Sequence, residues 1–271
     1  MLPLPRSVPV VRPLTLLALG LIGCAASPVD WTPQRVVARP AAAAVALAAD
    51  GMLHPDTMAA LAERVSAPAG PLCVGSLRVA AARGTLFGVW WSPRPDSGVR
   101  LLAARSANGG RIWSTPAPVD TTDAGMSGCR REPAAIAADS ASGYVHVTYA
   151  LQAGEGPGLF FSHSMDAGVT FHAPVPILYG ERLGRTSVAA DGDLVVVAFE
   201  DPNSTTPRIG LALSRTMGHM FEHRILPVSD DNGPAIHPLT AARGRRIAVA
   251  WEPGGANGAP ASLAVRTGTV R

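Results

Sequence analysis

The chain has 271 residues, of which 47% are hydrophobic and 16% are charged, so it can bury a substantial core and does not have the composition of a disordered protein. All 23 basic residues are arginines scattered along the sequence, and the first 23 residues hold two of them, which leaves 21 against 20 acidic residues. This near balance excludes a strongly basic surface, and we expect no nucleic-acid partner. The 25 Pro and 28 Gly are typical of many strands joined by turns.

The first 23 residues have the features of a secretory signal peptide. Arg6 and Arg12 precede an apolar run at 14–22, which is too short to span a membrane as a helix. The run ends in Leu21-Ile22-Gly23-Cys24, which resembles the lipobox of bacterial lipoproteins. The resemblance implies an exported chain that starts at an acylated Cys24 and touches the membrane through its lipid alone. Because Ala25 and not Asp follows Cys24, we expect the outer membrane. The alternative is an ordinary signal peptide with an incidental cysteine.

Residues 24–71 form the segment between the signal peptide and the predicted main domain. Trp31-Thr32-Pro33 begins a stretch at 31–37 that matches the outer strands further along the chain, so we expect it to complete the last repeat. Asp56-Thr57 precedes a pattern that favours a short capped helix at 58–65. A degenerate repeat around 47–51 is the alternative interpretation of this Ala-rich part.

From residue 72 to residue 271 the sequence repeats a unit of about 52 residues, a period typical of propeller blades. Each unit contains three recognisable strands, and the second has alternating polar and apolar residues that end on an aromatic. The first strands are predicted at 77–82, 133–138, 185–190 and 237–242. The second strands are predicted at 86–91, 144–149, 194–199 and 246–251. The third strands are predicted at 101–105, 159–163, 209–213 and 262–266.

Three third strands lead into an octapeptide that has the composition of a tight turn. Its pattern is Ser-x-Asp-x-Gly-x-Thr-aromatic, in which a short acceptor side chain bonds nearby backbone N–H groups and Gly takes a positive φ. The clearest copy is Ser164-Met165-Asp166-Ala167-Gly168-Val169-Thr170-Phe171. The other two place Ser106, Asn108, Gly110 and Trp113, or Ser214, Thr216, Gly218 and Phe221, at the same positions.

These octapeptides resemble the Asp box, or BNR repeat, of the sialidase-like β-propeller superfamily. The resemblance implies an all-β fold, here a propeller of about four four-stranded blades closed by the N-terminal strand. In that family the box is a structural turn away from the catalytic face, and the catalytic sialidases have six blades.

The loops that lead into the first strands of the blades carry the charged residues that we expect to bind a ligand. In a propeller these loops surround one mouth of the central channel, and guanidinium groups suit an anionic or hydroxyl-rich ligand. We therefore expect a non-catalytic module that binds a glycan or a cell-envelope protein, with ordinary surface ion pairs as the alternative. The candidate residues are Arg130, Arg131, Glu132, Arg182, Arg185 and His237.

A sialidase or a related glycoside hydrolase is the alternative function. By resemblance, its machinery would combine a nucleophilic Tyr with a Glu and three arginines, and the only suitable set is Tyr179, Glu181, Arg131, Arg182 and Arg185. The Phe/Tyr-Arg-Ile-Pro motif that marks the first arginine is absent, and Arg131-Glu132-Pro133 is a distant match. We expect no cofactor.

Two further cysteines, Cys73 and Cys129, each lie four residues before a predicted first strand, in consecutive blades. In an exported protein this equivalence favours a disulfide between the two blades, and two buried thiols are the alternative. The seven His residues form no short-range cluster with Cys or Asp, so we expect no metal site.

Overall fold

The computed structural model describes residues 26–38, 68–73, 75–125, 128–230, 233–254 and 262–271. Every regular element in these residues is a β-strand, and none of them forms a helix that could cross a bilayer. The predicted signal peptide, Cys24 and the predicted helix at 58–65 lie outside the described residues.

The strands form four antiparallel sheets that follow one another along the chain, as the sequence predicts for a four-bladed, propeller-like fold. The first contains β3 (Arg78–Ala82), β4 (Thr85–Pro93), β5 (Val99–Ser106) and β6 (Ala117–Asp120). The second contains β7 (Ala135–Ala138), β8 (Val145–Ala153), β9 (Gly156–Ser164) and β10 (Val175–Tyr179). The third contains β11 (Thr186–Asp191), β12 (Leu194–Glu200), β13 (Ile209–Ser214) and β14 (Leu226–Pro227).

The last sheet combines the two ends of the chain. It contains β15 (Ala235–Arg243), β16 (Arg246–Pro253) and β17 (Ser262–Val270), and two short N-terminal strands, β1 (Val29–Trp31) and β2 (Arg35–Ala38), share its outer position. Val29 pairs with Val270 and Arg35 pairs with Val265. The N-terminal strand therefore completes the last sheet, which is the closure that the sequence predicts.

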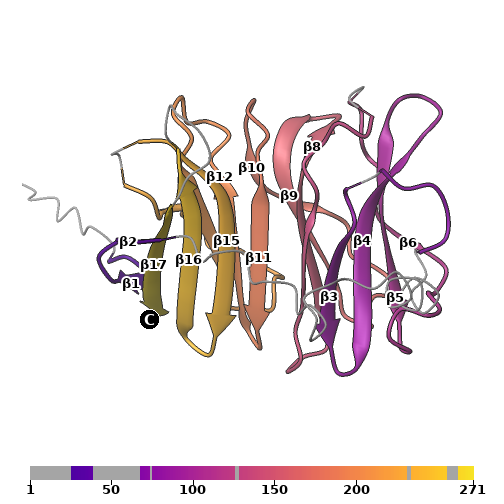
Figure 1. The fold of residues 1–271 in the computed structure, drawn as a ribbon, viewed down its shortest axis with the longest axis horizontal. Coiled ribbons are helices and arrows are strands. Elements are labelled where there is room, and N and C mark those ends of the chain that lie inside the picture. Colours follow the sequence, from indigo (N-terminus) through magenta and orange to yellow (C-terminus); the bar gives the residue numbers. More distant parts are fainter. Residues whose placement is uncertain (1–25, 39–67, 74, 126–127, 231–232, 255–261) are drawn as a thin grey trace, which may run out of the picture.

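Apolar side chains fill the spaces between consecutive sheets. In Figure 1 the sheets follow one another along the long axis, from the last sheet at one end to the first sheet at the other. Trp91 and Tyr149 pack edge to face between the first two sheets, with ring centroids 5.9 Å apart. Phe161 and Phe199 belong to the cluster between the second and third sheets, and Trp251 belongs to the cluster between the third and fourth. Burial of these rings stabilises each sheet against its neighbour.

The strand directions give the molecule two distinct rims. The innermost strands are β3, β7, β11 and β15, and they begin at one rim, which we call the entrance rim. In each antiparallel sheet the third strand runs parallel to the first, so β5, β9, β13 and β17 all end at the opposite rim. We call this second rim the turn rim, because the three octapeptides follow the ends of β5, β9 and β13 there.

The three octapeptides share two hydrogen bonds. The first Ser of each accepts a bond on Oγ from the N–H of its Gly, at 2.9, 2.7 and 3.1 Å in chain order. The residue two positions after the Ser then accepts a further backbone N–H, from Ile112 to Asn108, from Thr170 to Asp166 and from Met220 to Thr216, each at 2.9 Å. Thr216 thus replaces a carboxylate with a hydroxyl and keeps the turn.

Candidate functional site

Two neighbouring cavities open where the innermost strands begin. The smaller has a volume of about 310 Å³ and is lined by residues of all four innermost strands or the loops just before them. Its polar lining comes from Arg78, Arg185, Thr186, Ser187 and His237. This is the place that the sequence predicts for a binding site, at the mouth of a central channel.

The larger cavity, of about 710 Å³, lies beside it and is lined mainly by the loop that precedes β7 and by β8. Glu132 lines the larger cavity and Arg185 lines the smaller one. Arg185 Nε donates to Glu132 Oε2 at 2.7 Å, and both side chains are partly exposed. This ion pair joins the two cavities, and a ligand that spans both would meet both charges. The lining of the larger cavity is Gly125, Cys129, Arg130, Arg131, Glu132, Ala150, Gln152 and Leu183.

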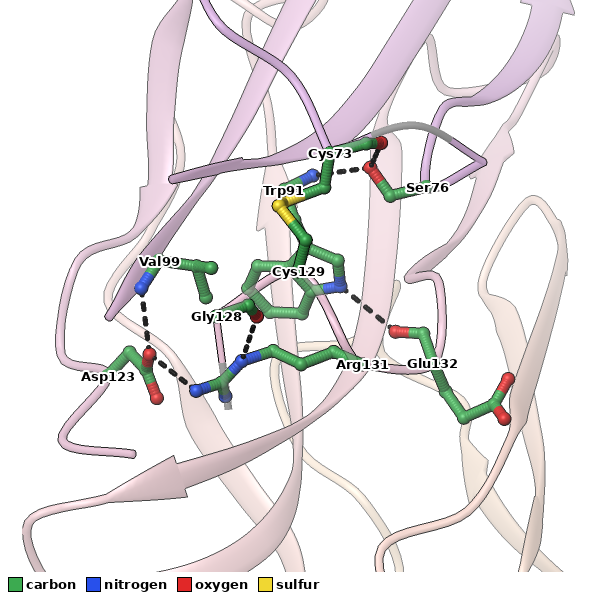
Figure 2. The surroundings of a disulfide bond; sticks show 9 residues. All are labelled: Cys73, Ser76, Trp91, Val99, Asp123, Gly128, Cys129, Arg131 and Glu132. Atoms are coloured by element: carbon green, nitrogen blue, oxygen red, sulfur yellow. Dashed lines mark hydrogen bonds and ion pairs between the residues drawn. A yellow bond between two sulfur atoms is a disulfide. The ribbon is translucent and has the colours of Figure 1, made fainter. Parts of the chain in front are cut away.

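Arg131 lines the larger cavity but is held inside the protein (Figure 2). Its guanidinium pairs with Asp123 at 2.7 Å, and both side chains are less than 10% exposed. Arg131 Nε also donates to the carbonyl of Gly128 at 3.1 Å, and the guanidinium lies 6.0 Å from the centroid of the Trp91 ring. Asp123 in turn accepts the N–H of Val99 at 2.9 Å. An arginine that is buried against Asp123, Gly128 and Trp91 shapes the cavity wall and is less accessible to a ligand than an exposed one.

Cys73 and Cys129 are joined by a disulfide, with their Cα atoms 5.2 Å apart. The bond ties the segment before the first sheet to the loop before the second (Figure 2), and Cys129 lines the larger cavity. Trp91 Nε1 donates to the carbonyl of Glu132 at 2.9 Å and fixes the same loop from the other side. The backbone that carries Arg130 and Glu132 is therefore held at two points.

Arg130 is exposed at the larger cavity, and among the described residues it has no hydrogen-bond or ion-pair partner. Its guanidinium is available to an anionic ligand. Arg130 and Arg185 are thus the two arginines of the predicted set that can reach a ligand in these cavities.

His237 lies in the smaller cavity in a strained backbone conformation. Its φ is +55°, unusual for a residue with a side chain, and the register of β15 shifts between Ile236 and Leu239. The N–H of His237 donates to Glu200 Oε1 at 2.8 Å, and its Nδ1 lies 2.9 Å from Glu252 Oε2. Glu200 therefore holds the backbone of His237 and Glu252 holds its imidazole, and strain of this kind is common at functional sites.

The remaining candidates lie elsewhere. Tyr179 is at the end of β10, the outermost strand of its sheet, and its ring contacts Phe160 edge to face at 5.9 Å. Glu181 is exposed in the following loop, and Arg182 Nη1 donates to the carbonyls of Ser204 and Thr205 at 3.1 and 2.6 Å. None of these three lines either cavity. The structure therefore does not bring Tyr179, Glu181, Arg131, Arg182 and Arg185 together.

Glu200 and Glu252 are site residues that the sequence analysis did not single out. Each follows the aromatic residue that ends a second strand, as Phe199-Glu200 and Trp251-Glu252. This repeated aromatic–Glu pair is the sequence feature that could have identified them, because equivalent positions in consecutive blades meet around the channel.

No protein-family model matches this sequence, and no curated protein matches it. Among solved structures, the chain is similar to a protein of unknown function from Dyadobacter fermentans DSM 18053, with 15% identity, a TM-score of 0.55, and coverage of 76% of this chain and 60% of that one. Two others are the Hadza microbial sialidase Hz136 (17% identity, TM-score 0.48, 66% and 42% covered) and the phage phi92 endosialidase (8%, 0.48, 71% and 35%). The chain spans less than two thirds of the length of each of these proteins. At 15% identity, the similarity to the Dyadobacter protein shows a similar fold and nothing about function.

Proposed function

We propose that the protein is an exported, lipid-anchored module that binds a glycan at the entrance rim without hydrolysing it. The observation that carries this proposal is the pair of adjoining cavities joined by the ion pair between Arg185 and Glu132. Guanidinium, carboxylate, imidazole and hydroxyl groups around one opening offer donors and acceptors to sugar hydroxyls, and Arg130 offers a charge to an acidic sugar.

The anchor is the acylated Cys24 expected from the lipobox-like sequence, and we place the protein in the outer membrane of the cell envelope. A cell-envelope protein is the other ligand class expected from the sequence. The polar cavities favour the glycan, because a stable protein partner would need a contact area much larger than these two openings.

The test is binding of the full-length protein to an array of sialylated, uronic-acid and neutral glycans. We expect Arg130→Ala and Arg185→Ala each to weaken binding about tenfold or more, because each removes a charge-assisted hydrogen bond. Arg100→Ala is the matched control, since Arg100 is exposed on β5 and lines neither cavity. Binding to no glycan in the array would overturn the proposal.

A glycoside hydrolase is the second candidate, and one observation favours it. Glu200 and Glu252 both bond to His237, and paired carboxylates are the usual machinery for cleaving glycosidic bonds. Turnover of a fluorogenic glycoside that is lost in Glu252→Gln would establish this function in place of the non-catalytic one. Tyr179→Phe is the control, because the structure places Tyr179 away from the cavities, and we expect it to leave turnover unchanged.

A further inference from the structure

The turn rim carries exposed apolar side chains at the tips of its three octapeptide turns. Ile112 is 71% exposed and Met220 is 69% exposed, and both immediately precede the aromatic residue of their turn. Met165 and Val169, in the middle turn, are 47% and 48% exposed. Large apolar side chains presented repeatedly on one rim are typical of an interaction surface.

The backbone at these tips is already hydrogen-bonded inside each turn. The N–H of Ile112 donates to Asn108 at 2.9 Å, the N–H of Val169 donates to Asp166 at 3.1 Å, and the N–H of Met220 donates to Thr216 at 2.9 Å. A loop without such bonds is costly to place in lipid, because its polar backbone groups lose water without gaining a partner. These tip N–H groups keep their partners when water is removed.

The start of the described chain lies at the same rim. Val29 pairs with Val270, the last residue of β17, so the chain enters the fold at the turn rim and runs toward the entrance rim. Cys24 precedes Val29 by five residues, a length that spans at most about 18 Å when fully extended. A lipid on Cys24 would hold the turn rim close to the bilayer.

The charges beside the tips are mixed. Arg215 pairs with Glu222 at 2.7 Å, and Asp166 is exposed in the middle turn. Arg111 is exposed beside Ile112, so the three octapeptides together hold two arginines and one aspartate. This small net charge does not require anionic lipid, and the tips fit the interface of a zwitterionic bilayer. The charged groups would remain at the level of the lipid headgroups.

We infer that the turn rim faces the bilayer and that Ile112, Met220 and the apolar side chains of the middle turn enter its interfacial region. This inference rests on the lipid anchor of the proposed function. Its consequence is a fixed orientation: the entrance rim, with both cavities, points away from the membrane and toward the ligand.

The test uses the full-length acylated protein in phosphatidylcholine vesicles. With Cys24 acylated and Cys73 bonded to Cys129, an introduced cysteine is the single free thiol. Ile112→Cys and Met220→Cys are labelled with an environment-sensitive fluorophore, and Glu155→Cys, exposed in the turn between β8 and β9 at the entrance rim, is the control. We expect a nitroxide on the lipid acyl chains to quench the first two labels at least about twofold more than the control.

Equal quenching at all three positions, in protein that still floats with the vesicles, would overturn the inference and leave the anchor intact. A mass spectrum without acyl groups on Cys24 would overturn both the anchor and the inference, while glycan binding at the cavities would still be measurable. A second experiment moves the label away from the two most exposed side chains. A fluorophore on Val169→Cys is expected to be quenched less in a protein that also carries Ile112→Gln and Met220→Gln. Unchanged quenching would contradict insertion of Ile112 and Met220.

Discussion

At the scale of single residues, one position decides the geometry of each octapeptide turn. In the middle turn Asp166 accepts hydrogen bonds from the N–H and the hydroxyl of Thr170, at 2.9 and 2.6 Å. The loss of some hydrating water alone would raise the pKa of Asp166, but the bonds from Thr170, Ser164 and Val169 outweigh it and lower that pKa to about 2. Asn108 makes the corresponding backbone bond without a charge, so the geometry depends on an acceptor and not on an anion.

We therefore expect Asp166→Ala to lower the free energy of unfolding by about 1–2 kcal/mol, because the N–H groups of Val169 and Thr170 lose their internal acceptor. Asp166→Asn should cost clearly less, since the amide oxygen can take the place of the carboxylate as it does at Asn108. Urea unfolding of both variants measures the difference. An Asn variant as unstable as the Ala variant would show that the charge, and not the acceptor, holds the turn.

A second residue-scale feature is a cluster of histidines near the turn rim. His163 stacks on His172 and meets His219 edge to face, with ring centroids 4.7 Å apart in both pairs. His146 lies beside them, is 0% exposed, and neither ring nitrogen has a hydrogen-bond partner among the described residues. Burial, followed by the nearby His163, lowers the pKa of His146 to about 4. His146 is therefore neutral in the folded protein at pH 7.

This lowered pKa makes stability depend on pH. An unfolded histidine titrates near 6.5, so between about pH 6.5 and 4 the unfolded chain binds a proton that the folded chain does not, and stability falls as pH falls. Over this whole pH range, the lowered pKa of His146 reduces the free energy of unfolding by about 3 kcal/mol. His146→Phe removes the titration and keeps an aromatic ring against Phe161, whose centroid lies 5.9 Å away. We expect this variant to lose less stability than the wild type over that pH range in urea titrations.

The matched control for this effect is His223→Gln, because His223 is exposed. Its unfolding free energy should follow the wild-type pH dependence. If the free energy of unfolding of His146→Phe depended on pH as that of the wild type does, His146 would not be buried in its neutral form.

At the scale of elements, the first three strands of each sheet could be predicted from sequence because their alternation is regular. The structure extends most second and third strands, such as β8, which runs to Ala153 and not to Tyr149, and it shortens two first strands, since β3 begins at Arg78 and β7 at Ala135. The outer strands have no such alternation, and two of them begin four residues after the aromatic of the preceding octapeptide, β6 at Ala117 and β10 at Val175. Prolines precede or interrupt these segments, for example Pro116 and Pro174, and proline cannot donate a ladder hydrogen bond.

The disulfide is the strongest constraint between two elements. It closes a sequence separation of 56 residues, for which loop-closure entropy gives about 4 kcal/mol. We expect replacement of Cys73 and Cys129 by Ala to lower the free energy of unfolding by about 2–4 kcal/mol and to loosen the loop that carries Arg130. A reducing agent should lower the wild-type urea midpoint and leave that of the double variant unchanged. If it moved both midpoints equally, the disulfide would not be the cause.

At the scale of the whole molecule, the position of the candidate site could be predicted but its chemistry only in part. The repeat placed the loops before the first strands at one rim, and Arg130, Glu132, Arg185 and His237 do line the cavities there. The sequence could not show that Arg131 is used internally, because no motif between β6 and β7 indicates that Asp123 and Arg131 of this one connection pair with each other. It could not exclude Tyr179 either, since only the pairing of β10 shows that this residue lies at the outer edge.

Completion of the last sheet by the N-terminal strands joins the two ends of the chain, and one glycine tests it. A Cβ on Gly268 would lie 2.5 Å from Val29 Cγ1 and 2.9 Å from Trp31 Cε3. Gly268→Ala should therefore displace β1 and cost about 1–3 kcal/mol, with faster hydrogen exchange in β1 and at the end of β17. Gly154→Ala is the matched control, because its Cβ would meet no atom within 4 Å. Unchanged exchange in Gly268→Ala would mean that the outer strands are not held against β17, and the last sheet would then expose a free edge to other chains.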